Sequence, residues 1–210
     1  MDIAGIRTEY RLQQLKESEV KADPLQQFQD WFKAAMEAKV NEPNAMNLST
    51  VKASGRPSSR IVLLKGVEEN GFVFYTNYNS NKGHQLQQHP FASLCFFWPE
   101  LERQVRIEGK ISKVSPAVSD AYFQSRPLAS RLGAWASPQS QIIAGRESLE
   151  KNLQEVTSKF TLDIPRPDHW GGYVLIPDYI EFWQGRESRL HDRITYSLDN
   201  EKWSINRLAP

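Results

Sequence analysis

The sequence of 210 residues has a single cysteine, Cys95, which excludes an internal disulfide bond. Cys95 stands inside the apolar run FASLCFFW, and this setting predicts an inert core residue. No stretch comes near the roughly 20 apolar residues that a membrane-spanning helix needs. The N-terminus, MDIAGIRTEYRLQQL, lacks the apolar core of a signal peptide. These absences predict a cytoplasmic protein with no membrane contact.

Excess charge is also lacking, since 26 Lys and Arg stand against 25 Asp and Glu, for a net charge of +1. No overall field therefore recruits nucleic acid, and an anion must be bound by local clusters of side chains. The sequence has neither a glycine-rich dinucleotide loop nor a P-loop nor a nucleophile elbow. Its four histidines lack the spacing of metal ligands, so no metal site is expected.

The chain does contain enough apolar material for one folded domain. Hydrophobic residues make up 40% of it, including ten Phe, seven Tyr and six Trp. Residues 1–22 are polar, and we expect a mobile segment or an active-site flap there. Residues 23–210 are expected to form a single domain.

A first helix is predicted over residues 24–40. Asp23 suits the N-cap and Pro24 suits the first helical position. Apolar residues at helical spacing are expected to form its buried face: Leu25, Phe28, Trp31, Phe32, Ala35 and Met36. Further helices are predicted over residues 80–90, 116–125 and 146–160, the first of them closed by Pro90.

Short β-rich runs broken by Gly, Pro and Asn predict antiparallel strands on both sides of these helices. They cover residues 45–53, 59–67, 71–77, 91–98, 102–114, 171–177, 179–185, 189–198 and 202–208. The order of elements indicates a mainly β fold with flanking helices (α+β), an antiparallel barrel and not a doubly wound α/β sheet.

Cationic side chains recur beside aromatic and amide side chains along these strands. The groups are Arg60 with Lys65; Tyr75 and Thr76 with Lys82; Gln104 with Arg106; and Tyr122 and Ser130 with Arg126. Each group alone is ordinary for a protein surface, but together they favour phosphate binding by side chains. Arg60 and Lys65 would point to opposite faces of a regular strand. Either a bulge intervenes, or one of the two acts beyond the strand's end.

The stretch FWQGRESRLHDR concentrates cations beside a tryptophan. In an extended strand, Arg189, His191 and Arg193 project from one side, and Leu190 and Asp192 project from the other. Two interpretations are open. The stretch is a solvated edge strand with Glu187 and Asp192 as salt-bridge partners, or it presents fixed cations to an anionic ligand.

The ordered motifs RIVLLK, VFYTN, ERQVRIEG, YFQSRP, PQSQ, WGGY, EFWQG, RLHDR and RLAP resemble the pyridoxine/pyridoxamine 5′-phosphate oxidase family. The resemblance runs from about residue 7 to residue 210. It implies a split β-barrel homodimer that binds FMN at the subunit interface. It also implies oxidation of pyridoxamine or pyridoxine 5′-phosphate to pyridoxal 5′-phosphate, with O2 re-oxidising the flavin and yielding H2O2.

The same resemblance assigns roles to residues. FMN contacts are expected from Arg60, Lys65, Tyr75, Thr76, Asn81, Lys82, Gln104, Gln139, Ser140, Trp183 and Arg193. Substrate contacts are expected from Arg7, Tyr10, Lys65, Tyr122, Arg126, Ser130, Arg189 and His191. Arg189 and His191 are the expected catalytic pair at the pyridine ring, where His191 orients the ring or moves a proton. At Asn81 the family usually has arginine, so one cationic contact to the FMN phosphate is missing.

Two other functions compete with the oxidase. A split-barrel protein could hold FMN or pyridoxal phosphate without turnover, but a pure binder has no need of both Arg189 and His191 over the ring. A nucleic-acid-binding barrel would need a basic groove, which the net charge of +1 argues against.

Overall fold

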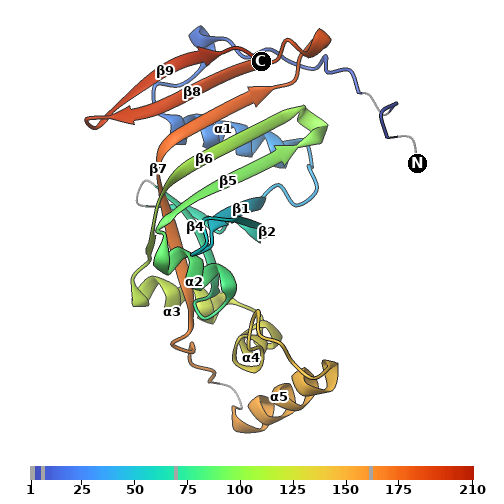
Figure 1. The fold of residues 1–210 in the computed structure, drawn as a ribbon, viewed down its shortest axis with the longest axis vertical. Helices are drawn as coiled ribbons and strands as arrows, with labels where there is room; N and C mark the ends of the chain where they lie inside the picture. Colours follow the sequence, from blue (N-terminus) through green and yellow to red (C-terminus); the bar gives the residue numbers. More distant parts are fainter. Residues whose placement is uncertain (1–2, 6–7, 69–70, 161–162) are drawn as a thin grey trace.

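The computed structural model describes residues 3–5, 8–68, 71–160 and 163–210. Within them, a curled nine-stranded antiparallel sheet carries five α-helices (Figure 1). Its strands are β1 (Ala45–Val51), β2 (Pro57–Leu63), β3 (Gly66–Glu68), β4 (Gly71–Asn77), β5 (Phe91–Trp98), β6 (Arg103–Lys113), β7 (Trp170–Gln184), β8 (Asp192–Asp199) and β9 (Lys202–Leu208). Its helices are α1 (Pro24–Glu37), α2 (Asn81–Gln88), α3 (Pro116–Ser125), α4 (Leu128–Ala136) and α5 (Arg146–Lys159). The predicted mainly β fold with flanking helices is confirmed.

The longest strand, β7, organises the sheet. The strand order is β2-β1-β5-β6-β7-β4-β3, and β8 also pairs with β7 and then with β9. The first half of β7 pairs with β4, and its second half pairs with β8. Two separate strands had been predicted here. They form one strand because Pro177 and Asp178 lie at a register shift opposite Gly109, a bulge that tolerates proline.

Helix α1 forms where its sequence predicts and covers one face of the sheet (Figure 1). The Asp23 carboxylate accepts the Leu25 N–H at 2.8 Å, and Pro24 takes the first helical position. Phe28, Trp31 and Ala35 are buried in the core, but Met36 is 52% exposed. The prediction of a buried Met36 is wrong, because the Met36 side chain lines a surface groove and not the core.

Strand β5 has one face in the core and one face exposed on the surface of the chain. Alternation along the strand puts Phe91, Cys95 and Phe97 on this face, and both phenylalanines are more than half exposed. Cys95 is half-buried, so the prediction of a core cysteine is wrong. The apolar run fills both faces of the strand, and only one of them faces the core. An apolar face of this kind is typical of a surface that another chain covers.

Helix α4 was not predicted. Its apolar side chains Leu132 and Trp135 pack against Phe123 and Trp170 in a small second cluster. With α5, α4 forms an arm that extends away from the sheet (Figure 1). No helix of the described residues is long and apolar enough to cross a membrane.

Candidate active site

A cavity of about 560 Å³ opens where β2, β4 and the start of β7 meet α3 and α4. Nine predicted site residues line it: Arg60, Lys65, Tyr75, Thr76, Lys82, Tyr122, Arg126, Ser130 and Gln139. None of the described residues along its wall is acidic. Four cationic side chains without a carboxylate make a site suited to an anion.

Lys82 is the most deeply placed of these cations, with only 9% of its surface exposed. Its Nζ donates to Thr76 Oγ1 at 3.2 Å, to Ser80 Oγ at 3.3 Å and to Gln139 Oε1 at 3.3 Å. All three acceptors are neutral. Burial lowers the pKa of Lys82, and the nearby Arg60 lowers it further. A buried ammonium without a carboxylate gains from an anionic ligand.

Arg60 is held in place by neutral groups of the sheet and of α2. Its Nη1 donates to Thr50 Oγ1 at 2.6 Å, and its Nη2 donates to Ser58 Oγ at 2.6 Å and to Gln85 Oε1 at 3.2 Å. Burial lowers its pKa. Lys65 follows the end of β2 at Leu63, so the second of the two alternatives for this pair holds. Because Lys65 lies beyond the strand, both cations reach the same cavity.

Arg126 lies against an aromatic stack on the far wall. The rings of Tyr75 and Tyr122 are stacked with centroids 3.8 Å apart, and Trp170 stacks on Tyr75 at 5.5 Å. The Arg126 Cζ lies 4.5 Å from the centroid of Trp170. Among the described residues, the buried Arg126 Nη1 has no hydrogen-bond partner. An unpaired donor at a cavity wall is a ready contact for a phosphate oxygen.

Trp170 was missed as a site residue, although WGGY was singled out as a motif. The available signal was its position next to two glycines that permit close packing. A side chain at Gly172 would clash with Tyr75, because a Cβ there would lie 2.8 Å from Tyr75 Cε1. The other cavity residues outside the prediction are Ile61, Val62, Leu63, Asn77, Gly133, Ala134 and Ser137.

A second group of predicted residues lies around the end of β7 and the loop before β8. The Trp183 and His191 rings have centroids 4.7 Å apart, and the Tyr10 ring packs on both at 5.6 and 5.8 Å. Gln104 and Arg193 sit directly opposite Trp183 on the neighbouring strands. None of these five residues lines the cavity of the first group.

The stretch 189–193 is not a strand throughout, so the prediction that its three basic residues share one strand face is wrong. β8 begins at Asp192. Arg189 ends a 3₁₀ turn, Glu187–Arg189, in which Ser188 and Arg189 have φ of 55° and 60°. A left-handed conformation costs a non-glycine residue about 1 kcal/mol. The surrounding structure therefore has to hold this turn in place.

His191 is held in one tautomer. The Arg186 backbone N–H donates to His191 Nδ1 at 3.1 Å, so the neutral ring carries its proton on Nε2. Burial lowers the pKa of His191, and Arg189 lowers it further. The neutral ring can therefore donate a hydrogen bond from Nε2 to a ligand.

Glu187 and Asp192 both form salt bridges, as the first interpretation expected, but Arg193 pairs with a buried carboxylate of β7 instead. Arg193 pairs with the buried Glu181 through two contacts, at 2.8 and 3.1 Å. Asp192 binds Arg186 and Arg207, and Glu187 binds Arg11.

The remaining predicted residues lie apart from both groups or outside the residues that the structure describes. Asn81 is the exposed first residue of α2, and Ser140 is exposed with φ of 71°. Neither lines the cavity. Arg7 lies outside the described residues. No group of three metal-ligating side chains occurs in the described part of the chain.

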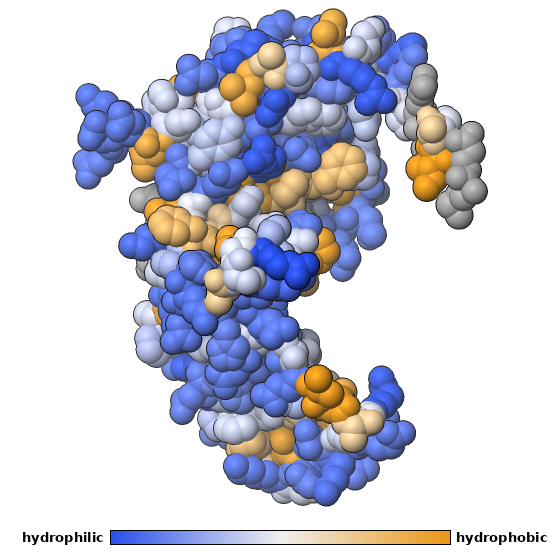
Figure 2. All heavy atoms as spheres, in the orientation of Figure 1, coloured by the Kyte–Doolittle hydropathy of each residue, from blue (hydrophilic) through white to orange (hydrophobic). Residues whose placement is uncertain are grey.

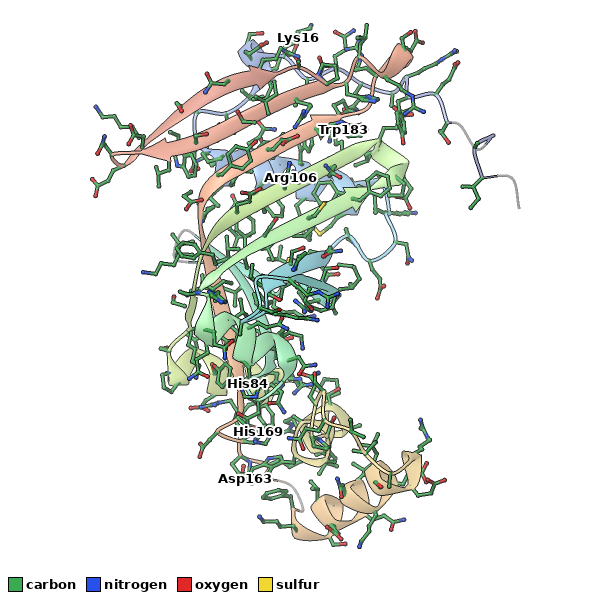
Figure 3. The ribbon with its side chains drawn as sticks, viewed as in Figure 1. Lys16, His84, Arg106, Asp163, His169 and Trp183 are labelled. Carbon is green, nitrogen blue, oxygen red and sulfur yellow. The ribbon has the colours of Figure 1, made fainter. Side chains whose placement is uncertain are left out.

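The two groups lie at opposite ends of β7, which starts at Trp170 in the cavity wall and passes through Trp183 near its end. At about 3.3 Å per residue, the strand covers about 40 Å of its length between these two residues. In Figure 3, Trp183 lies towards one end of the molecule, and His169, the neighbour of Trp170 in sequence, lies towards the other. The two groups of one chain therefore lie well apart.

The fold and the cavity define an antiparallel half-barrel protein with a cationic ligand site. Family models extend this. The model described as pyridoxamine 5′-phosphate oxidase matches residues 32–160, and the model of the pyridoxine 5′-phosphate oxidase C-terminal dimerisation region matches residues 170–210. The chain belongs to the pyridoxamine 5′-phosphate oxidase family. The predicted family, and with it an oxidoreductase, is confirmed.

Individual relatives agree with this. A Cyanothece sp. protein named pyridoxine/pyridoxamine 5′-phosphate oxidase is 56% identical over 211 residues, covering 100% of this chain and 99% of the relative. One from Actinobacillus pleuropneumoniae with the same name is 55% identical over 210 residues, with 100% of both chains covered. The structure of PhzG from Burkholderia lata, in complex with tetrahydrophenazine-1-carboxylic acid, matches with a TM-score of 0.87 and 30% identity, covering 92% of this chain and 95% of that one. The split-barrel prediction is confirmed by this likeness.

Proposed function

We propose that the protein is an FMN-dependent oxidase that converts pyridoxamine 5′-phosphate and pyridoxine 5′-phosphate into pyridoxal 5′-phosphate, with O2 reduced to H2O2. The observation that carries the proposal is the cavity lined by Arg60, Lys65, Lys82 and Arg126, in which no described lining residue is acidic. Substrate and cofactor each bring a phosphate, and two phosphates need several cations. The named relatives support the choice of ligands.

The cavity residues divide between the two ligands. Lys82 donates to Thr76, and Arg60 is near enough to lower the pKa of Lys82, so these three residues suit the FMN phosphate. Arg126, Tyr122 and Ser130 come from α3 and α4 on the opposite wall, which suits the substrate phosphate. Lys65 lines the same cavity and is assigned to both ligands. FMN, when bound, supplies the acceptor for the hydride that leaves the substrate.

A second copy of the chain completes the site in this proposal. The group around Trp183, Arg189 and His191 is too far from the cavity of its own chain, so it serves the cavity of a partner. Ile61, Phe91 and Phe97 are each more than half exposed on the open face of the sheet, where Figure 2 shows apolar side chains. The match of residues 170–210 to a dimerisation region supports a C2 homodimer.

Arg189 and His191 then approach the substrate ring from the partner. Arg189 supplies a fixed positive charge, which stabilises charge that moves toward the flavin as the hydride leaves. His191 donates a hydrogen bond from Nε2 and, being neutral, adds no second cation. Tyr10 packs on the His191 ring and limits its motion.

The test is anaerobic mixing of the flavin-loaded protein with pyridoxamine 5′-phosphate. The visible flavin band should bleach as pyridoxal 5′-phosphate forms in equal amount, and admission of air should restore the band and yield H2O2. A protein that binds FMN but keeps its band under these conditions is a non-catalytic binder, which refutes the oxidase. A protein that takes up no FMN refutes the oxidase and the FMN binder, and leaves only a binder of pyridoxal phosphate.

Asn81 provides a prediction about cofactor affinity. If residue 81 faces the FMN phosphate, Asn81→Arg adds a charge-assisted contact. After the entropy cost of ordering a longer side chain is subtracted, the net gain in binding free energy should be about 0.5–1.5 kcal/mol. FMN binding should tighten a few-fold, up to about tenfold, with kcat nearly unchanged. A fluorescence titration of apo-protein at two salt concentrations measures this. Equal affinity at low salt would show that residue 81 faces away from the phosphate.

A further inference from the structure

The N-terminal segment, residues 8–17, lies along the group around His191. Tyr10 contacts the rings of Trp183 and His191, with centroids 5.6 and 5.8 Å away. Gly185 leaves room for it, because a Cβ at that position would lie 2.7 Å from Tyr10 Cγ. The Leu12 N–H donates to Glu102 Oε2 at 3.0 Å. Tyr10 therefore has a defined place, although its own neighbourhood in sequence is polar and exposed.

The segment is anchored at Leu15, where side chain and backbone are both fixed. The side chain is 5% exposed and belongs to the main core. The Leu15 N–H donates to Asp192 Oδ2 at 3.1 Å, and its carbonyl accepts from Arg207 Nη2 at 2.8 Å. Asp192 and Arg207 are themselves paired at 2.7 Å. The Asp192–Arg207 ion pair thus binds both the N–H and the carbonyl of Leu15, a residue almost the whole length of the chain away in sequence.

This ion pair is part of a larger network. Arg207 also binds the Glu17 carboxylate through Nε and Nη2, and Asp192 also accepts from Arg186 Nη1 at 3.1 Å. The Asp192 side chain is only 16% exposed. Burial acts to raise the pKa of Asp192, but the contacts from Leu15, Arg207 and Arg186 outweigh it and lower the pKa. Isolated surface pairs contribute little, whereas a network with a backbone anchor fixes geometry.

We propose that Asp192 and Arg207 are positioning residues that fix Leu15 and so hold Tyr10 against Trp183 and His191 before substrate arrives. The proposal rests on the proposed function, in which Tyr10 contacts the substrate. Apparent affinity falls with the fraction of molecules that have the competent arrangement. Loosening the anchor should therefore weaken substrate binding and leave the chemical step and the cofactor largely as they are.

The anchor itself is tested by amide hydrogen exchange of the flavin-loaded protein, which needs no catalysis. Asp192→Ala and Arg207→Gln should speed exchange at Leu12 and Leu15 by about tenfold or more, while amides of α1 stay unchanged. In Arg207→Lys, the exchange rates at Leu12 and Leu15 should lie between those of the wild type and of Arg207→Gln, since lysine keeps the charge and loses the bidentate contact. Lys16→Gln, which removes an exposed neighbour paired with Glu19, is the matched control. Unchanged exchange at Leu15 in both Asp192→Ala and Arg207→Gln would overturn the proposal.

The consequence for the site is tested by the KM for pyridoxamine 5′-phosphate and the Kd for pyridoxal 5′-phosphate. In Arg207→Gln both should rise roughly 3- to 10-fold, with kcat within about twofold and full flavin content. In a Tyr10→Ala background the same change should have no further effect on Kd, because Tyr10 is the group being held. Faster exchange at Leu15 with unchanged Kd, or an equal effect without Tyr10, would make the network purely structural and overturn the proposal. A wild-type protein that never oxidises the substrate refutes the proposed function instead, and the exchange experiment still decides the anchor.

Discussion

Replacing Lys82 with methionine should weaken FMN binding by roughly 10- to 100-fold, because a charge-assisted contact contributes about 1.5–3 kcal/mol. The same change should stabilise the apo-protein. Lys82 is 9% exposed and its three acceptors are neutral, so its burial costs free energy that no carboxylate offsets. Methionine has a similar volume and no charge to desolvate. We expect a gain of about 1 kcal/mol in the apo-protein's free energy of unfolding.

Two measurements check this pair of opposite effects: fluorescence titration with FMN, and thermal unfolding of the apo-protein. Lys110→Met is the matched control, since Lys110 is exposed on β6 and remote from the cavity wall. It should change neither quantity. An apo-protein that becomes less stable while FMN affinity is retained would show that Lys82 serves the fold and not the cofactor.

Replacing Arg126 with alanine should raise the KM for pyridoxamine 5′-phosphate roughly 10- to 100-fold while flavin content stays intact. The buried Nη1 of Arg126 has no partner among the described residues, so the ligand phosphate is its expected acceptor. The guanidinium also covers Trp170, so a loss of stability of about 1 kcal/mol should accompany the change.

Steady-state kinetics and the flavin absorbance of the purified variant decide the assignment. Arg131→Ala is the control, because Arg131 has an unpaired buried nitrogen on α4 but does not line the cavity. Its KM should remain near that of the wild type. A flavin-free Arg126→Ala protein with an unchanged KM would move Arg126 from the substrate to the cofactor.

Local signals in the sequence predicted much of the fold. Asp23 and Pro24 fix the start of α1 through a cap and a preset φ, both of which depend on neighbours in sequence. Pro90 stands two residues after the last residue of α2, Gln88, and proline cannot continue a helix. Alternating strands such as β6 were also recognisable, because one face is buried along its length. These features need no knowledge of distant contacts.

The loop before β8 could not be predicted in the same way. A strand was expected from the alternation of Arg189, His191 and Arg193, but alternation describes side chains only where the backbone is extended. The positive φ of Ser188 and Arg189 breaks that condition, and nothing in their side chains signals it. The anchoring of Leu15 by Asp192 depends on residues far apart in the chain and was equally hidden.

The cavity could be predicted from the sequence only in part. Its cations were predicted from motifs, since most lie at the ends of recognisable strands and helices. What the motifs could not show is that one chain separates the predicted residues into two groups at opposite ends of β7. The roles assigned to these residues stay predictions. So does the division of the chain into a segment of residues 1–22 and a domain of residues 23–210.

The most direct test of the central claim, an oxidase site completed by two chains, is complementation between two defective variants. Arg126→Ala removes a cavity residue, and Arg189→Ala removes a residue of the second group. Each alone should have little activity at low substrate concentration. After co-refolding, half of the dimers are mixed and each has one intact site, so about a quarter of wild-type oxidation of pyridoxamine 5′-phosphate should return. No recovery in a sample shown to contain mixed dimers would contradict the account, since each site would then belong to one chain.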